Sequence, residues 1–280
     1  MTARNRVMRT LMGEQEGLPF LAVAEALAPR LVDCSYAEMT ADSNNWVSGV
    51  QQAAKLLTAD AVCIGFDSQL AVEACRANAS EPETAAPMAV LFEAAERLFA
   101  VQRNNLACVL AVAGPATLAA QLTSGLTQRE AMAAVKPQAT RLVEAASRLR
   151  PDMIVFVEAE GVLTTQPSPE LRRLYATLGK VIAHYGIVSG IQAPGAQGLE
   201  TLGCNVLFCD ASAPLPTEAW DALVVALPPQ PAEAEAIAKN LVTGRGQRRP
   251  AIAVGIQGIT RTADLEHLRS IRATLATLVP

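Results

Sequence analysis

Three carboxylates stand just beyond apolar runs of the sequence and could carry acid, base or cation-binding chemistry. Glu158 and Glu160 follow the run 153–157 and are separated by one alanine. Residues i and i+2 of an extended segment share a face, so this pair could act as general acid and base, or could bind a cation or metal through oxygen. Asp67 follows the run 61–65 and could bind a substrate cation, orient an N–H group or move a proton. We predict that Asp67, Glu158 and Glu160 are catalytic.

Each of these three carboxylates could instead have a purely structural role. Asp is a favoured helix N-cap, so Asp67 could simply begin the helix that follows it. Of the two glutamates, one could face the site while the other meets solvent or an arginine. We favour one functional glutamate over two.

The elements that must position these residues are eight short apolar runs of the kind that form strands buried on both faces. They are rich in Val, Ile, Leu or Ala, and most are separated by segments long enough for a helix. The pattern predicts an α/β fold, a (β/α)8 TIM barrel with parallel strands, in a single domain spanning residues 1–280. The runs are 18–23, 61–65, 106–113, 153–157, 187–191, 205–209, 222–227 and 251–256.

Active sites of such barrels lie at the carboxyl ends of the strands, so the residues that follow the runs are candidates. Gln192 and Gln257 stand directly after the fifth and eighth runs. A side-chain amide can both donate and accept hydrogen bonds. We expect Gln192 and Gln257 to bind substrate, and to line one pocket with Asp67 and at least one of the two glutamates.

The composition argues against several classes of protein. The chain has 280 residues, of which 51% are hydrophobic and 4% aromatic, and its net charge is −4. It therefore offers no broad cationic field for nucleic acid or for an anionic membrane surface. No run approaches the length of a membrane span, and the N-terminal stretch lacks the apolar segment of a signal peptide. We expect a soluble protein of the cytoplasm.

Other kinds of catalytic site find little support. The six cysteines are scattered and suit small core residues better than disulfides, and both histidines fall within helical patterns. No His or Cys cluster has the spacing of zinc ligands. The sequence also lacks a G-x-S-x-G elbow, a P-loop and a G-x-G-x-x-G segment, which argues against serine hydrolases and common nucleotide-binding enzymes.

Four stretches carry a likeness to a known family. The most specific contains Gly114-Pro115-Ala116-Thr117-Leu118, which is similar to that family's Gly-Pro-x-Thr-Leu turn; the others are 6–20, 60–67 and 251–261. Over nearly the whole chain they resemble the uroporphyrinogen decarboxylase superfamily, near its cobamide-dependent methyltransferase-like branch. The resemblance implies a barrel enzyme, and it implies that Asp67 occupies the position of a pyrrole-binding aspartate.

The chain departs from this family at the residues that do its chemistry. The methyltransferases hold zinc with a His-x-Cys-Gly segment and a cysteine of the last strand, where this chain has Gln192-Ala193-Pro194-Gly195 and Ile256-Gln257-Gly258. None of these is a zinc ligand, so we expect a zinc-independent protein without a bound metal. Gln257 also replaces a histidine of the decarboxylases. Arg6 and Arg9 are loose analogues of their acetate-binding arginines, which makes both candidates for substrate binding.

Two functions follow from the resemblance and the departures. The first is a divergent enzyme of this superfamily, a decarboxylase-like lyase or a methyltransferase, acting on a small acidic or methoxylated substrate. It would hold no cofactor tightly, and a corrinoid protein or a folate would be its methyl partner. The second is a non-catalytic or regulatory barrel that docks a corrinoid protein or a catalytic homologue. Either could be a homodimer.

Overall fold

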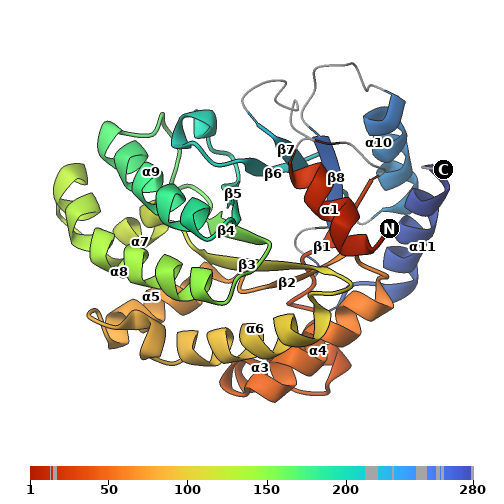
Figure 1. Cartoon of the computed structure of the whole chain (residues 1–280), viewed down its shortest axis with the longest axis horizontal. Coiled ribbons are helices and arrows are strands. Elements are labelled where there is room, and N and C mark those ends of the chain that lie inside the picture. Colours follow the sequence, from red (N-terminus) through yellow and green to blue (C-terminus); the bar gives the residue numbers. More distant parts are fainter. Residues whose placement is uncertain are drawn as a thin grey trace. The chain divides into compact units, whose positions relative to one another are not determined.

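The computed structural model describes residues 1–12, 14, 18–211, 220–228, 230–243, 251–256, 259 and 262–278. Within these residues, eight strands form one sheet in the order β1-β8-β7-β6-β5-β4-β3-β2, with α-helices between most successive strands. This is the (β/α)8 TIM barrel with parallel strands that the sequence predicts, and the fold class is confirmed (Figure 1). The strands are β1 (Phe20–Ala22), β2 (Ala61–Ile64), β3 (Ala107–Ala113), β4 (Met153–Val157), β5 (Val188–Gln192), β6 (Val206–Asp210), β7 (Ala222–Ala226) and β8 (Ala251–Ile256).

The helices follow the strands as expected for such a fold. They are α1 (Ala3–Leu11), α2 (Ala28–Leu31), α3 (Tyr36–Ala41), α4 (Ser43–Leu56), α5 (Ser68–Ala77), α6 (Met88–Gln102), α7 (Pro115–Leu122), α8 (Gln128–Arg148), α9 (Pro169–His184), α10 (Pro231–Thr243) and α11 (Leu265–Leu278). Two short 3-10 helices, η1 (Pro82–Thr84) and η2 (Leu199–Leu202), lie in the connections.

β3 and β4 show why these runs become strands. Every residue of both is buried, so side chains pointing to either face leave water, which suits their unbroken apolar composition. β3 ends at Gly114-Pro115, because proline has no N–H for a sheet ladder and is well suited to the first turn of α7.

The chain divides into two compact units. Unit 1 comprises Met1–Cys63, Ala100–Cys108 and Val206–Pro280, and unit 2 comprises Ile64–Phe99 and Val109–Asn205. Each unit is described below by itself. The expectation of one domain over residues 1–280 stays a prediction.

In unit 1, a buried carboxylate ties several elements to the amino end of β2. Asp60 is 3% exposed and its Oδ2 accepts a hydrogen bond from the backbone N–H of Phe20, at 2.8 Å. Arg6 of α1 lies 2.5 Å from the Asp60 Oδ1, and Arg272 of α11 lies 3.7 Å from its Oδ2. Arg272 also donates to the carbonyl oxygen of Thr58, at 3.1 Å. Asp60 therefore joins α1, β1 and α11.

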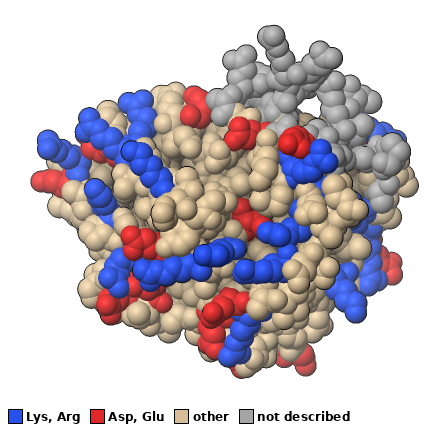
Figure 2. Space-filling view, in the orientation of Figure 1, with Lys and Arg blue, Asp and Glu red and all other residues tan. Residues whose placement is uncertain are grey.

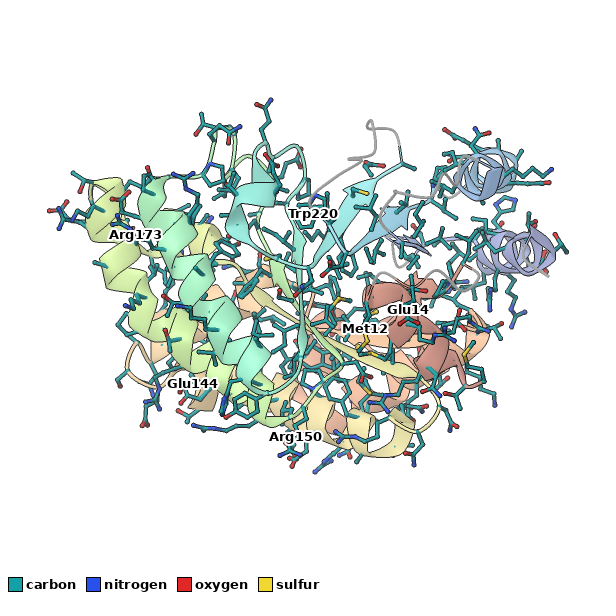
Figure 3. All side chains as sticks on the ribbon, turned by 45° about the horizontal axis from the view of Figure 1, so that its top comes forward. Met12, Glu14, Glu144, Arg150, Arg173 and Trp220 are labelled. Atoms are coloured by element: carbon teal, nitrogen blue, oxygen red, sulfur yellow. The ribbon has the colours of Figure 1, made fainter. Side chains whose placement is uncertain are left out.

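In unit 2, two long helices begin at side-chain caps. The Thr127 hydroxyl accepts from the backbone N–H of Glu130 ahead of α8, and the Ser168 hydroxyl accepts from that of Leu171 ahead of α9. Pro169 is the first residue of α9, a position where the missing N–H of proline costs no hydrogen bond. The side chains of Glu144 and Arg173 mark these two helices in Figure 3.

The surface carries charges of both signs. On the face shown in Figure 2, Lys and Arg side chains lie beside Asp and Glu side chains. Among the residues that the structure describes, no helix combines the length and the apolar character needed to cross a membrane.

Candidate functional site

Glu158 is a buried carboxylate directly after β4, and hydrogen-bond donors surround it. Its side chain is 1% exposed. The Oε1 atom accepts from the Ala116 N–H at 3.0 Å and from the Tyr175 hydroxyl at 2.5 Å. The Oε2 atom accepts from the N–H and the hydroxyl of Thr117, both at 2.6 Å. A carboxylate has about four lone-pair sites, so contacts within the protein use its accepting capacity in full.

The Gly-Pro-x-Thr turn is built around this carboxylate. A Cβ atom at Gly114 would overlap the Glu158 carboxyl group, so the position has room only for glycine. Pro115 is the first residue of α7 and has no N–H, and the next two N–H groups both donate to Glu158. A negative charge is favourable at a helix N-terminus. The Thr117 hydroxyl oxygen in turn accepts from the Ala159 N–H at 2.7 Å, which anchors the loop after β4.

The orientation of Glu158 follows from its neighbour two residues earlier. The Phe156 ring packs edge-on against the Tyr175 ring of α9, with 5.0 Å between centroids. Alternate residues of a strand share a face, so Phe156 and Glu158 both lie on the face that α9 covers. Glu158 therefore points toward the helices, where it fixes α7 and α9, and not toward the opposite face of the sheet.

Burial governs the protonation of this cluster. Burial raises the pKa of Glu158, while its hydrogen bonds from Thr117, Tyr175 and Ala116 lower that pKa by a smaller amount. Burial also raises the pKa of Tyr175, and the charge of Glu158 adds to the effect. Tyr175 is therefore a neutral donor to Glu158.

Gln192 lies on the opposite face of the sheet from Glu158. In the register of β3, β4 and β5, Val157 pairs with both Ala113 and Gln192, whereas Phe156 belongs to the neighbouring row. Paired residues of a parallel sheet share a face, so Gln192 is turned away from the helices. Its Oε1 atom is buried and has no hydrogen-bond partner among the described residues. This oxygen is unusual, because nearly all buried polar groups in proteins have a hydrogen-bond partner.

The other two predicted catalytic residues make separate contacts. Asp67 is half-buried and caps α5, its Oδ1 accepting from the Gln69 N–H at 3.0 Å. Glu160 is exposed in the loop beyond the end of β4. The structure joins Glu158 and Gln192 through their backbones, since the Glu158 N–H donates to the Gln192 carbonyl at 2.8 Å. A pocket shared by Asp67, a glutamate and Gln192 stays a prediction.

The predicted substrate-binding arginines are both paired within unit 1. Arg6 is bound to Asp60 at the amino ends of β1 and β2, whereas barrel active sites lie at the carboxyl ends. Arg9 forms an exposed pair with Glu14, at 2.8 Å. Gln257 lies outside the described residues. A role for these three side chains in substrate binding stays a prediction.

Sequence reasoning missed three residues that the structure makes prominent. Thr117 and Tyr175 complete the Glu158 cluster, and the spacing of the sequence gives no sign that α7 and α9 meet there. Glu25, in the turn after β1, is 5% exposed and its Oε1 accepts from the Trp46 indole N–H at 2.7 Å. The sequence does contain a signal for Glu25, because a single charged residue within the apolar stretch Ala22–Leu27 indicates a buried and paired carboxylate.

The described residues do not fit a zinc site at the end of β5. Gln192, Ala193 and Pro194 offer no thiolate or imidazole. Burial raises the pKa of Cys204 to about 12 and that of Cys209 to about 12, so both are neutral thiols near pH 7. Among the residues that the structure describes, no group of three or more His, Cys, Asp or Glu side chains could hold a metal ion.

Comparison with solved structures shows the same fold in methyltransferases. A methyltransferase from Methanosarcina mazei matches with a TM-score of 0.80 and 15% identity, over 99% of both chains. The homocysteine methyltransferase MmuM from Escherichia coli matches with a TM-score of 0.56 and 15% identity, over 95% of this chain and 98% of its own. A putative vitamin-B12 independent methionine synthase from Listeria monocytogenes has a TM-score of 0.56 and 11% identity, over 96% and 98%. Neither a protein-family model nor a curated protein matches the sequence.

Proposed function

We propose that the chain is an enzyme of the methyl-transfer type that acts on a small molecule at the carboxyl ends of its strands. The observation that carries the proposal is the TM-score of 0.80 with the Methanosarcina mazei methyltransferase over 99% of both chains. The two other similar structures also bear names of methyl-transfer enzymes. Because one fold can serve many reactions, the residues at the strand ends must also be compatible with this function.

The charges at the strand ends of unit 2 favour a neutral or cationic substrate. The segments that follow β2, β3, β4 and β5 are 65–67, 114, 158–168 and 193–205. They contain no Lys or Arg, and they contain Asp67, Glu160 and Glu200 in addition to Glu158, whose oxygens are already bonded within the protein. An acidic substrate needs cationic partners of the kind that arginine provides. Of the two substrate classes that the resemblance suggests, we therefore propose the methoxylated or otherwise methylated one over the acidic one.

The residues of this site divide into two roles. Asp67 and Gln192 are the groups that we propose to contact substrate, because one is a half-buried carboxylate after β2 and the other is a side-chain amide at the carboxyl end of β5. Glu158 is a positioning residue, since four donors within the protein occupy its oxygens. Zinc has no part in this proposal.

Transfer of a labelled methyl group tests the proposal. The purified protein is incubated with methoxylated compounds that carry a trideuteromethyl group and with cob(I)alamin or tetrahydrofolate as the acceptor, and products are identified by mass spectrometry. A mass increase of the acceptor that depends on the protein supports methyl transfer. Release of carbon dioxide from uroporphyrinogen, without methyl transfer, would support the decarboxylase alternative instead.

A second candidate is the non-catalytic barrel that docks a corrinoid protein or a catalytic homologue. The observation in its favour is that Glu158, fully buried at a strand end, is committed to structural hydrogen bonds and is unsuited to proton transfer. This candidate predicts that no substrate turns over, and that addition of the chain changes the activity of the partner enzyme.

A further inference from the structure

Helices α8 and α9 of unit 2 form a cationic surface on an acidic chain. They pack side by side and together carry seven Lys and Arg residues and three Glu residues, whereas the whole chain has a net charge of −4. Figure 2 shows Lys and Arg side chains gathered over these two helices, at the left of the view. We define the α8–α9 face by five exposed cations: Arg129, Lys136, Arg172, Arg173 and Lys180.

The charges of the α8–α9 face are not paired within the described structure. None of the five cations forms an ion pair or a hydrogen bond through its charged group with another described residue. By contrast, Arg97, an exposed arginine of α6, pairs with Glu93 at 2.5 Å. The one exposed carboxylate of α8 and α9, Glu130, already accepts from the N–H and the hydroxyl of Thr127. Positive charge therefore remains on this face without carboxylates paired to it.

The cations recur at the same interval on both helices. Arg129 and Lys136 lie seven residues apart in α8, and Arg173 and Lys180 lie seven residues apart in α9. Seven residues make about two helical turns, or about 10 Å along the axis, so the two members of each pair lie on one side of their helix. A partner helix with carboxylates seven residues apart presents negative charge at the same interval.

We propose that the α8–α9 face docks a second protein through a helix whose Glu or Asp side chains recur every seven residues. Single ion pairs on a surface are weak, but several pairs at matching intervals fix the orientation and the register of the partner. The inference goes beyond the proposed function, because α8 and α9 lie outside the sheet and the proposed reaction takes place at the strand ends.

Two other anionic partners fit the α8–α9 face less well. A nucleic acid would extend past this face and meet a chain whose net charge is negative. A helix that binds in a membrane surface also inserts apolar side chains, and no large apolar side chain of α8 or α9 is exposed. An acidic helix needs only the cations that the face presents.

Two labelled peptides of equal composition test the spacing. Both are rich in alanine and have about 20 residues, which is long enough for a helix. One carries glutamates every seven residues, and the other carries the same glutamates in scrambled order. Binding to the full chain is measured by fluorescence anisotropy. We expect the regularly spaced peptide to bind about fivefold more tightly, equivalent to about 1 kcal/mol, and its affinity to fall as salt is added.

Charge reversal assigns the binding to the α8–α9 face. Arg173→Glu and Lys180→Glu should each weaken binding of the regularly spaced peptide about tenfold, because an attraction becomes a repulsion. Arg97→Glu is the matched control, since it makes the same change of charge at an exposed arginine of unit 2 that is already paired. At about 0.1 M salt, where charges beyond about 10 Å are screened, this control should stay within about twofold of the wild type. Melting curves check that all variants fold.

Several outcomes would overturn the inference. They are equal binding of the two peptides, binding of neither, and an equal loss in Arg97→Glu and Arg173→Glu. Vesicles of phosphatidylglycerol and a DNA duplex serve as competing probes, and tighter binding of either one than of the regularly spaced peptide would also contradict it. Sedimentation of the chain alone tests a second copy as the occupant. A dimer that Arg173→Glu abolishes would assign the face to self-association instead.

Discussion

Gly114 and Glu158 are packed so closely that a side chain at position 114 would occupy the space of the Glu158 carboxyl group. The Gly114 backbone has φ −72° and ψ 156°, a conformation open to any residue. Space, and not backbone conformation, therefore selects glycine. The glycine, the proline and the threonine of the turn all serve the burial of one carboxylate.

Gly114→Ala should destabilise the protein by about 1–3 kcal/mol, because the added methyl group must displace a hydrogen-bonded carboxylate. Urea unfolding gives the free energy. Gly179→Ala is the control, since that glycine lies in α9 with open space around it, and it should raise stability by about 0.5–1 kcal/mol. Equal stability of Gly114→Ala and the wild type would show that Glu158 is free to move.

Glu158→Gln should destabilise the protein by about 2–4 kcal/mol. The amide nitrogen of glutamine cannot accept, so at least one donor from Ala116, Thr117 or Tyr175 loses its partner in a buried place. Glu160→Gln removes the same charge from an exposed position and should change stability by less than about 0.5 kcal/mol. A stable Glu158→Gln protein would contradict the positioning role.

Part of this arrangement could be predicted from the sequence. The apolar runs predict the strands to within about two residues, because a strand buried on both faces needs an unbroken apolar stretch. Because such strands are apolar on both faces, the sequence does not show to which face the residues after each strand point. β4 carries no polar residue to mark its inner face, so the sequence could not show that Glu158 turns toward the helices while Gln192 turns away.

Glu158 and Glu160 lie in different surroundings for a local reason. Alternation holds only while the chain is extended, and β4 ends at Val157. Glu158 continues the strand direction, but Ala159 is already held by Thr117, and Glu160 reaches the surface. The partners of Glu158 come from α7 and α9, far away in the sequence, and only the packing of the fold reveals them.

Asp60→Asn should cost about 1–3 kcal/mol, because it removes the charge that Arg6 and Arg272 share at the amino end of β2. This loss of stability is smaller than for a fully buried ion pair, because the side chains of both arginines are partly exposed. Glu14→Gln breaks the exposed pair with Arg9 and should cost less than about 0.5 kcal/mol. Thermal unfolding of both variants makes the comparison, and similar losses would show that burial of Asp60 adds nothing.

The reactivity of Cys209 should keep rising with pH where an ordinary thiol levels off. Burial, aided by the charge of Asp210, raises its pKa to about 12, against about 8.5 for a free cysteine. Alkylation of Cys209, followed by peptide mass spectrometry, should therefore accelerate about tenfold per pH unit between about pH 8 and about pH 10. Asp210→Asn should speed the reaction at a given pH. A plateau near pH 9 in the wild type would contradict the shift.

The rate of labelled methyl transfer by Asp67→Asn tests the central claim most directly. Asn caps a helix as well as Asp does, so this change keeps the cap on α5 and removes only the charge. Asp42→Asn is the matched control, because Asp42 caps α4 through the same kind of bond, at 2.8 Å from the Asn44 N–H. The account predicts unchanged melting temperatures for both variants, a rate at least about tenfold lower for Asp67→Asn, equivalent to about 1.4 kcal/mol in the barrier, and a wild-type rate for Asp42→Asn. A wild-type rate for Asp67→Asn would contradict it, and Asp67 would then be a helix cap alone.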